Sequence, residues 1–350
     1  MRHALTWLSA AALAALATLS AACTPSYKAL GPLSFKDVRY DSVGGVSWPE
    51  RRLRLPGVEK AHRLPGPLMV HYVELNPGGA QTVLFLHGLG SSLKFWRYQL
   101  DAFAAKGYRV IALDLPGFGK SDKPASFPYT MEAMADVVRE VARAANADRP
   151  ILVGHSMGGQ TALSFAIRYP GELRALILAS PAGFEEFSPN EKEWLRKVFS
   201  VRLIKRTTEY GVWGAVRRNN FARWRPEYEW LIEDRVRLAQ SKEFDAYAYA
   251  NVKTVGGLSN NDFIRQRLGE VKAPTLIVYG DRDALIPNPF LHGGRTAAIM
   301  EYGHAGIQGS KLVELEGCGH TVQIDCAPEY NAAALGFLAG LARAPGAERP

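Results

Sequence analysis

Short apolar segments alternate with longer amphipathic segments from about residue 68 onward, and this alternation is the strongest constraint on the fold. The apolar segments are four to eight residues long and rich in Val, Ile and Leu, as in strands buried on both faces of a parallel sheet. Strands are expected at 68–75, 82–87, 109–114, 151–154, 175–179, 275–279 and 311–315. Helices are expected at 93–106, 131–145, 157–169 and 329–342. The pattern predicts an α/β domain with a mostly parallel sheet flanked by helices.

The alternation stops between about residues 182 and 270, where helical patterns, arginines and tryptophans take its place. The tryptophans are Trp194, Trp213, Trp224 and Trp230. We therefore expect a mostly helical insertion at 182–270 that sits on an α/β core formed by 67–181 and 271–345. Residues 23–66 are rich in Pro, Gly and Arg and show no long periodicity, which predicts a tether and an irregular lead-in.

The first residues have the features of a secretory signal peptide. Arg2 and His3 precede an apolar run over 4–22 that ends in small residues, and Cys23 follows. The sequence Leu-Ser-Ala-Ala-Cys that ends at Cys23 resembles the lipobox of bacterial lipoproteins, in which the cysteine is acylated after cleavage. The alternative is an ordinary signal peptide that ends near a cysteine. We expect cleavage of residues 1–22, export to the periplasm or outer membrane, and membrane association through a lipidated Cys23.

Charge and cysteine content narrow the classes of partner. The chain has 42 Lys and Arg against 34 Asp and Glu, a modest net charge of +8. Dedicated nucleic-acid-binding proteins cluster their basic residues more tightly, so we expect no nucleic-acid partner. The excess still permits an anionic substrate or membrane surface. Export would allow Cys318 and Cys326 to form a disulfide, which the sequence leaves open because it does not give their Cα separation.

A predicted strand leads into the sequence Gly-His-Ser-Met-Gly-Gly at 154–159, and a predicted helix follows. This is a Gly-x-Ser-x-Gly motif in a strand–turn–helix context, in which a sharp turn lifts the serine hydroxyl above the sheet. The alternative is a tight glycine turn that happens to hold a serine. We expect Ser156 to be a nucleophile, with the backbone N–H of Met157 pointing toward the same space.

Several further motifs recur in a fixed order along the chain. They are His-Gly-Leu-Gly at 87–90, Asp-Leu-Pro-Gly-Phe-Gly-Lys-Ser at 114–121, Gly-Asp-Arg-Asp at 280–283 with Pro287, and Gly-His at 319–320. With the serine motif, they make the chain similar to the α/β-hydrolase family. The resemblance is to its branch of cap-bearing serine esterases, monoacylglycerol-lipase-like enzymes and C–C bond hydrolases. It covers about 68–180 and 270–342, and it implies an α/β-hydrolase fold in which the insertion at 182–270 is a helical cap.

The resemblance also implies a catalytic triad in the chain order Ser, acid, His. A serine hydroxyl needs a base, and His320 follows the last predicted strand, whereas His292 and His304 follow none. The family pattern Gly-x-x-Asp-x-x-x-Pro favours Asp283 as the acid that orients this base. Asp281 is the alternative acid, and it is otherwise expected to cap a turn or to pair with a neighbouring arginine.

Two backbone N–H groups are expected to form the oxyanion hole. Met157 supplies one, and Leu89, in the loop after the strand at 82–87, supplies the other. We expect His87 to shape this loop. The segment 114–121 lacks the spacing of a phosphate-binding loop, no Gly-x-Gly-x-x-Gly follows a strand, and no His-Glu-x-x-His occurs. We therefore expect neither a cofactor nor a metal.

The implied reaction is acyl transfer to water. Ser156 attacks the carbonyl of a carboxylic ester with His320 as general base, and the acyl-enzyme is then hydrolysed. An envelope location favours lipid-like or other apolar acyl groups as the small-molecule substrate. An acyltransferase, or a C–C bond hydrolase acting on a vinylogous diketone, would use the same triad. A non-catalytic envelope binding lipoprotein is the alternative from a different class.

Arginines and aromatic residues cluster in the insertion. The cluster contains Arg217, Arg218, Arg223 and Arg225 among Trp213, Phe221, Trp224, Tyr228 and Trp230. In one interpretation the aromatic residues pack the cap onto the core while the arginines are solvated. In the other, a basic aromatic rim meets a membrane surface or an anionic substrate.

Overall fold

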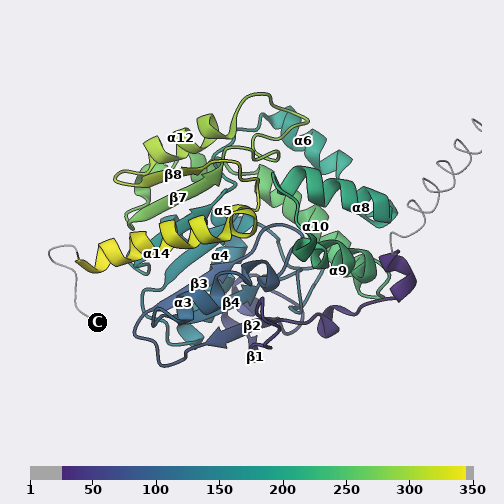
Figure 1. The fold of residues 1–350 in the computed structure, drawn as a ribbon, viewed down its shortest axis with the longest axis horizontal. Coiled ribbons are helices and arrows are strands. Elements are labelled where there is room, and N and C mark those ends of the chain that lie inside the picture. The colour runs from purple at the N-terminus through teal and green to yellow at the C-terminus, as the bar shows by residue number, and fades with distance from the viewer. Residues whose placement is uncertain (1–25, 344–350) are drawn as a thin grey trace, which may run out of the picture.

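The computed structural model describes residues 26–343, so the predicted signal peptide at 1–22 and Cys23 lie outside the described residues. Its centre is a sheet in the order β1-β2-β4-β3-β5-β6-β7-β8 (Figure 1). The strands are β1 Glu50–Arg54, β2 Met69–Leu75, β3 Thr82–Leu86, β4 Arg109–Asp114, β5 Ile151–His155, β6 Ala175–Ala179, β7 Thr275–Gly280 and β8 Lys311–Leu315.

The sheet is parallel from β4 to β8, and β2 pairs antiparallel with both of its neighbours, β1 and β4. Every residue of β3, β5, β6 and β7 is buried, which is why these strands read as unbroken apolar runs in the sequence. The predicted α/β class with a mostly parallel sheet flanked by helices is confirmed.

Two hydrophobic cores lie on opposite faces of the sheet because successive side chains of a strand point to opposite sides. On β3, Leu84 and Leu86 join the core under α4 and α5, whereas Val83 and Phe85 join the core under α3 and α14. These helices are α3 Leu100–Ala104, α4 Met131–Ala144, α5 Met157–Arg168 and α14 Ala327–Arg343. The first core also receives residues from α2 Pro56–Ala61 and α12 Thr296–Gly306.

The segment between β6 and β7 contains helices and no strand, and we call its residues 182–270 the cap. Its helices are α6 Pro189–Val198, α7 Val201–Arg206, α8 Glu209–Ala215, α9 Trp230–Leu238, α10 Phe244–Ser259 and α11 Asp262–Arg265, with a π-helical turn at Val216–Asn220. Phe221 and Tyr228 are buried against Ile324 of α13 Val322–Asp325. Part of the aromatic cluster therefore packs the cap onto the core, as the first interpretation expected.

The structure differs from the sequence-based prediction in three elements. The predicted irregular lead-in contains α2 and the edge strand β1, which the search for apolar runs missed because most of its residues are charged and exposed. The helix predicted at 93–106 is a 3₁₀ turn at Leu93–Trp96 followed by α3. The break places Gln99 in the interior, where its side chain donates to Gln323 O. Helix α12 lies in the stretch after residue 284, where no helix was predicted.

None of the helices within residues 26–343 combines the length and the hydropathy that crossing a membrane requires.

Candidate active site

Ser156 occupies a strained turn between β5 and α5. Its backbone angles are φ 52° and ψ −114°, in a region that side-chain-bearing residues rarely adopt and that costs about 1–3 kcal/mol. The flanking glycines make the turn sterically feasible. A Cβ on Gly158 would lie 2.1 Å from Leu86 O, and a Cβ on Gly154 would lie 2.3 Å from Gly158 O. The sharp turn expected from the motif is therefore present, and its backbone passes directly against β3.

His320 is paired with Asp283 at 2.7 Å between Nδ1 and Oδ2. Both side chains are almost fully buried. The other carboxylate oxygen of Asp283 accepts hydrogen bonds from the backbone N–H groups of Leu285 and Ile286, so the acid is fixed from two sides. Because Nδ1 faces the carboxylate, Nε2 is the nitrogen left for proton transfer with a nucleophile.

The alternative acid has a different position. One carboxylate oxygen of Asp281 accepts hydrogen bonds from the backbone N–H groups of Gly317 and Cys318, at 2.6 and 3.2 Å. Asp281 thus fastens the turn that leads to His320, whereas Asp283 contacts the imidazole itself. The structure brings His320 together with Asp283, the acid that the family pattern favours.

The other histidines that the sequence offered have structural partners. His87 Nε2 accepts from the N–H of Leu115, and the ring lies against Gly88 O. His155 Nε2 lies 3.1 Å from His320 O. Burial lowers the pKa of both rings, and for His155 the neighbouring His320 adds to the effect. His292 contacts Glu185 and Glu191, and His304 contacts Ser310.

The two backbone groups expected to form the oxyanion hole flank Ser156. Met157 is the first residue of α5 and is fully buried. The loop after β3 also passes close by, since a Cβ on Gly88 would lie 3.3 Å from Ser156 Cβ, and Leu89 is the next residue. Partial positive charge from a helix N-terminus and a loop N–H suits an oxygen that becomes negative during the reaction.

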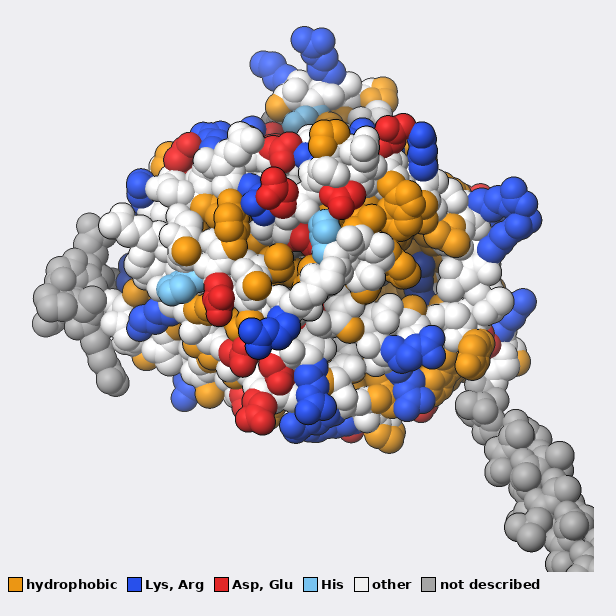
Figure 2. Space-filling view, turned by 90° about the horizontal axis from the view of Figure 1, so that it is seen from above, with side chains coloured by type: hydrophobic (Ala, Val, Ile, Leu, Met, Phe, Trp, Pro, Cys, Tyr) orange, Lys and Arg blue, Asp and Glu red, His pale blue; other side chains and the backbone are white. Residues whose placement is uncertain are grey.

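A cavity of about 500 Å³ lies between core and cap. Ser156, His320 and Leu89 line it from the core, and residues such as Phe199 and Leu231 line it from the cap. The view from above shows a hollow in the surface with hydrophobic side chains gathered around it (Figure 2). A mainly apolar cavity with polar groups in its lining is the usual form of a small-molecule site.

The comparisons with known proteins agree with this geometry. The family model described as alpha/beta hydrolase fold matches residues 81–327. This chain belongs to the α/β-hydrolase family.

Curated relatives of this α/β hydrolase are named as hydrolases of oxo-dienoate and oxo-dienedioate compounds. The chain is 32% identical to 2-hydroxy-6-oxo-6-phenylhexa-2,4-dienoate hydrolase of Comamonas testosteroni over 77% of this chain and 91% of the relative. It is 28% identical to a 2-hydroxy-6-oxononadienedioate/2-hydroxy-6-oxononatrienedioate hydrolase of Paraburkholderia phymatum, again over 77% and 91%.

Solved structures show the same fold. A probable hydrolytic enzyme from Pseudomonas aeruginosa PAO1 superposes with a TM-score of 0.77 at 24% identity and covers 88% of this chain and 98% of its own. An esterase from Exiguobacterium antarcticum superposes with a TM-score of 0.64 at 24% identity, over 78% and 96%. At this level of identity the superpositions show a shared fold.

Arg235 adds a positive charge to the cavity. This residue was not among those predicted from the sequence. Its side chain forms no ion pair with any residue of the described range, and its Nη1 is buried without a hydrogen-bond partner there. The guanidinium lies 4.8 Å from the ring centre of Tyr247 and 5.1 Å from that of Phe244. The adjacent Asp234 is engaged by Lys94 at 2.7 Å. One of many arginines in the cap, Arg235 gave no signal in the sequence that set it apart.

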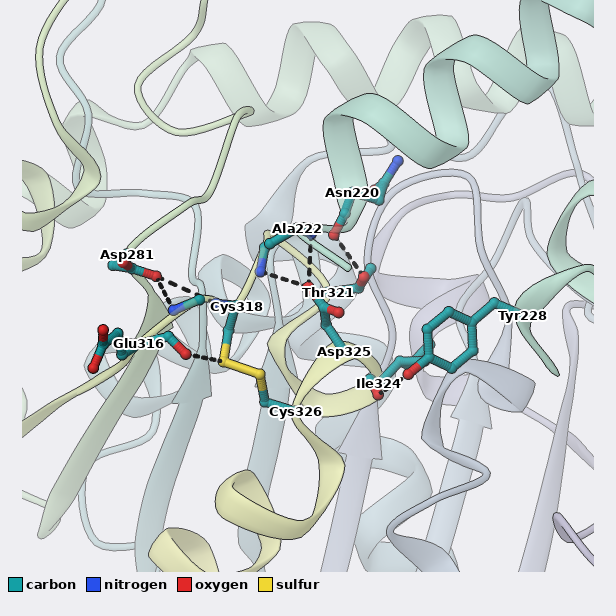
Figure 3. Close-up of a disulfide and its surroundings, with 12 residues drawn as sticks. Asn220, Ala222, Tyr228, Asp281, Glu316, Cys318, Thr321, Ile324, Asp325 and Cys326 are labelled. Carbon is teal, nitrogen blue, oxygen red and sulfur yellow. Dashed lines mark hydrogen bonds between the residues drawn. A yellow bond between two sulfur atoms is a disulfide. The ribbon is translucent and has the colours of Figure 1, made fainter. Parts of the chain in front are cut away.

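A disulfide closes the loop that carries His320. Cys318 and Cys326 are bonded with a Cα separation of 6.0 Å (Figure 3), so the pairing that the sequence left open is present. The bond joins the residue two positions before His320 to the start of α14. Both cysteines are buried. This covalent link limits the movement of the histidine away from the cavity.

Asp325 connects this loop to the cap, and sequence analysis missed it. One oxygen of its buried carboxylate accepts from the N–H of Gly319 at 2.8 Å and of Ala222 at 2.7 Å (Figure 3). Nearby, both the N–H and the hydroxyl of Thr321 donate to Asn220 O. Burial raises the pKa of Asp325 although these hydrogen bonds oppose the change. The sequence does offer one indication of this role, because Asp325 is an acid directly before Cys326 in a largely apolar segment.

We expect the disulfide to contribute about 2–3 kcal/mol to the free energy of unfolding, because it closes a loop with a sequence separation of 8. Urea unfolding of the wild type with and without dithiothreitol should show this loss. The Cys318→Ala/Cys326→Ala variant is the matched control, with reduced stability and no response to the reductant. Unchanged wild-type stability, with thiol titration proving full reduction, would contradict the prediction.

Proposed function

We propose that this α/β hydrolase cleaves carboxylic esters through an acyl-enzyme on Ser156. The observation that carries the proposal is the arrangement of the strained serine turn and the His320–Asp283 pair around one apolar cavity. A serine at the start of a helix, with a paired histidine in the same cavity, has the parts that acyl transfer needs. The proposal goes beyond hydrolase chemistry, which the family membership already gives.

In the proposed reaction each group has one role. His320 Nε2 removes the proton as Ser156 Oγ attacks the carbonyl carbon, and Asp283 stabilises the imidazolium that forms. The N–H groups of Leu89 and Met157 stabilise the oxyanion. His320 then gives the proton to the leaving alcohol and the acyl-enzyme forms. Water, deprotonated by the same histidine, releases the acid and restores the serine.

A second candidate function is the hydrolysis of a carbon–carbon bond in an acidic substrate, and Arg235 is the observation that favours it. A cavity that holds an unpaired guanidinium can bind a carboxylate with charge-assisted hydrogen bonds. The names of the curated relatives specify dienoate and dienedioate substrates, which carry such a group. An ester that bears a carboxylate on its acyl part would fit the same position.

Replacement of Ser156 by Ala is expected to abolish ester hydrolysis without unfolding the protein. The measurement is turnover of a p-nitrophenyl ester series from acetate to palmitate by wild type and variant. The chain-length optimum would give the size of the acyl site. Turnover that survives in the variant would refute the role of Ser156. If the wild type hydrolyses none of these esters but cleaves 2-hydroxy-6-oxo-6-phenylhexa-2,4-dienoate, the second candidate function is favoured.

The two neighbouring acids give a matched pair of variants. Asp283→Asn should lower kcat by about 10⁴-fold, because the amide no longer holds the histidine tautomer or stabilises its charge. Asp281→Asn should leave kcat within a few-fold, since the amide oxygen still accepts from Gly317 and Cys318. Steady-state kinetics on the best ester tests both. Equal losses in the two variants would contradict the assignment of the acid.

Arg235→Gln should weaken binding of acidic substrates selectively. We expect KM for mono-p-nitrophenyl glutarate to rise about 10–100-fold. This is the loss of affinity expected when a hydrogen bond to a charged group is removed from a buried site. KM for p-nitrophenyl pentanoate, which has no carboxylate, should change little. If both esters respond equally, Arg235 acts through the packing of the cap and the preference for an acidic substrate is wrong.

A further inference from the structure

The described chain begins on the cap, next to α8. The Ser26 hydroxyl and the Tyr27 N–H both donate to the carboxylate of Glu209, each at 2.8 Å. The ring of Tyr27 is buried with Val212 and Ile232. The 3₁₀ turn Tyr27–Leu30, drawn in purple, therefore lies beside α8 and α9 (Figure 1). This contact fixes the position of residue 26, the first residue that the structure describes.

Exposed apolar and basic side chains lie on the Tyr27–Leu30 turn, on α7 and at the start of α8, and we call this set the α7–α8 face. It consists of Lys28, Leu30, Arg202, Leu203, Arg206 and Tyr210. Tyr210 is 80% exposed, Leu30 56% and Leu203 49%. No residue of α7 is buried. Ile204 packs partly against the core, whereas Leu203 and the basic side chains of this short helix face solvent. Exposed apolar and basic side chains together have the composition of an interfacial membrane segment.

The charges on this face are not neutralised within the described protein. Lys28, Arg202 and Arg206 form no ion pair with any residue between 26 and 343. Asp245 pairs with Lys205, whereas Glu209 accepts only from uncharged groups of the N-terminal turn and keeps its charge. Three basic side chains are thus opposed by one carboxylate beside them. The face therefore presents a net positive potential to solvent, which attracts the anionic headgroups of phospholipids.

The same face lies close to the cavity. Phe199 precedes α7 and Ala215 ends α8, and both line the cavity that holds Ser156. Four of the six residues of the α7–α8 face lie on the segment between them. A molecule that leaves a bilayer at this face would therefore be near the cavity.

Chain length connects the face with the expected lipid anchor. Three peptide units separate Cys23 from Ser26, a span of at most about 11 Å. A lipid on Cys23 would hold this corner of the cap against the bilayer. We propose that the α7–α8 face docks the protein on an anionic phospholipid bilayer and brings the cavity to the lipid. The docking is independent of the bond that the enzyme cleaves.

The experiment measures vesicle binding by a chain that starts at Thr24, which keeps the whole described fold and cannot be lipidated. Vesicles of phosphatidylcholine alone are compared in sedimentation with vesicles containing equal parts of phosphatidylglycerol. We expect binding to the anionic vesicles that weakens with salt. Arg202→Gln/Arg206→Gln should reduce the partition coefficient about 25-fold, or about fivefold for each charge removed.

The matched control is Lys60→Gln/Lys106→Gln. It removes two exposed charges from the surface of the α/β domain, outside the cap, and it should bind the vesicles as the wild type does. All three proteins should hydrolyse a soluble ester equally, because none of these side chains lines the cavity. Absence of binding to anionic vesicles would overturn the proposal. Equal losses in the two variants would also overturn it, because they would show attraction by net charge alone.

Discussion

The closest backbone contact in the site is the one on which the rest of the structure depends. β5, β3 and the start of α5 meet so tightly at residues 154 and 158 that only glycine fits there. This contact allows Ser156 to hold a strained backbone at the end of the sheet. The strain is tolerated because β5 is hydrogen-bonded on both sides and α5 packs along its whole length.

His320 is held in place by a different set of contacts from those that hold Ser156. It lies on a loop after the last strand, where a flexible chain would lower the fraction of time that the ring faces the serine. Asp281 fastens the beginning of this loop, the disulfide closes it, and Asp325 joins it to the cap. The position of the base and the position of the cap are therefore coupled through one small group of buried contacts. A displacement of the cap would also displace the loop that carries His320.

The cap gives this common fold its individual properties. It supplies an unpaired arginine inside the cavity and a basic, apolar outer face beside the N-terminal end. The first property bears on which molecules bind, and the second on where the protein finds them. The sheet and its serine turn are compatible with many substrates, and the cap is where selection among them takes place.

The sequence by itself determined the parallel sheet, the serine turn and the order of the site residues. Buried strands and tight glycine turns have local sequence patterns that can be recognised without knowing which segments they contact. It missed the charged edge strand β1, whose pattern depends on its neighbour, and it left the acid and the disulfide open. Tertiary structure alone paired His320 with Asp283, bonded Cys318 to Cys326 and turned Arg235 into the cavity. These outcomes depend on distances between segments far apart in the chain or on the direction of a side chain, and local composition carries neither.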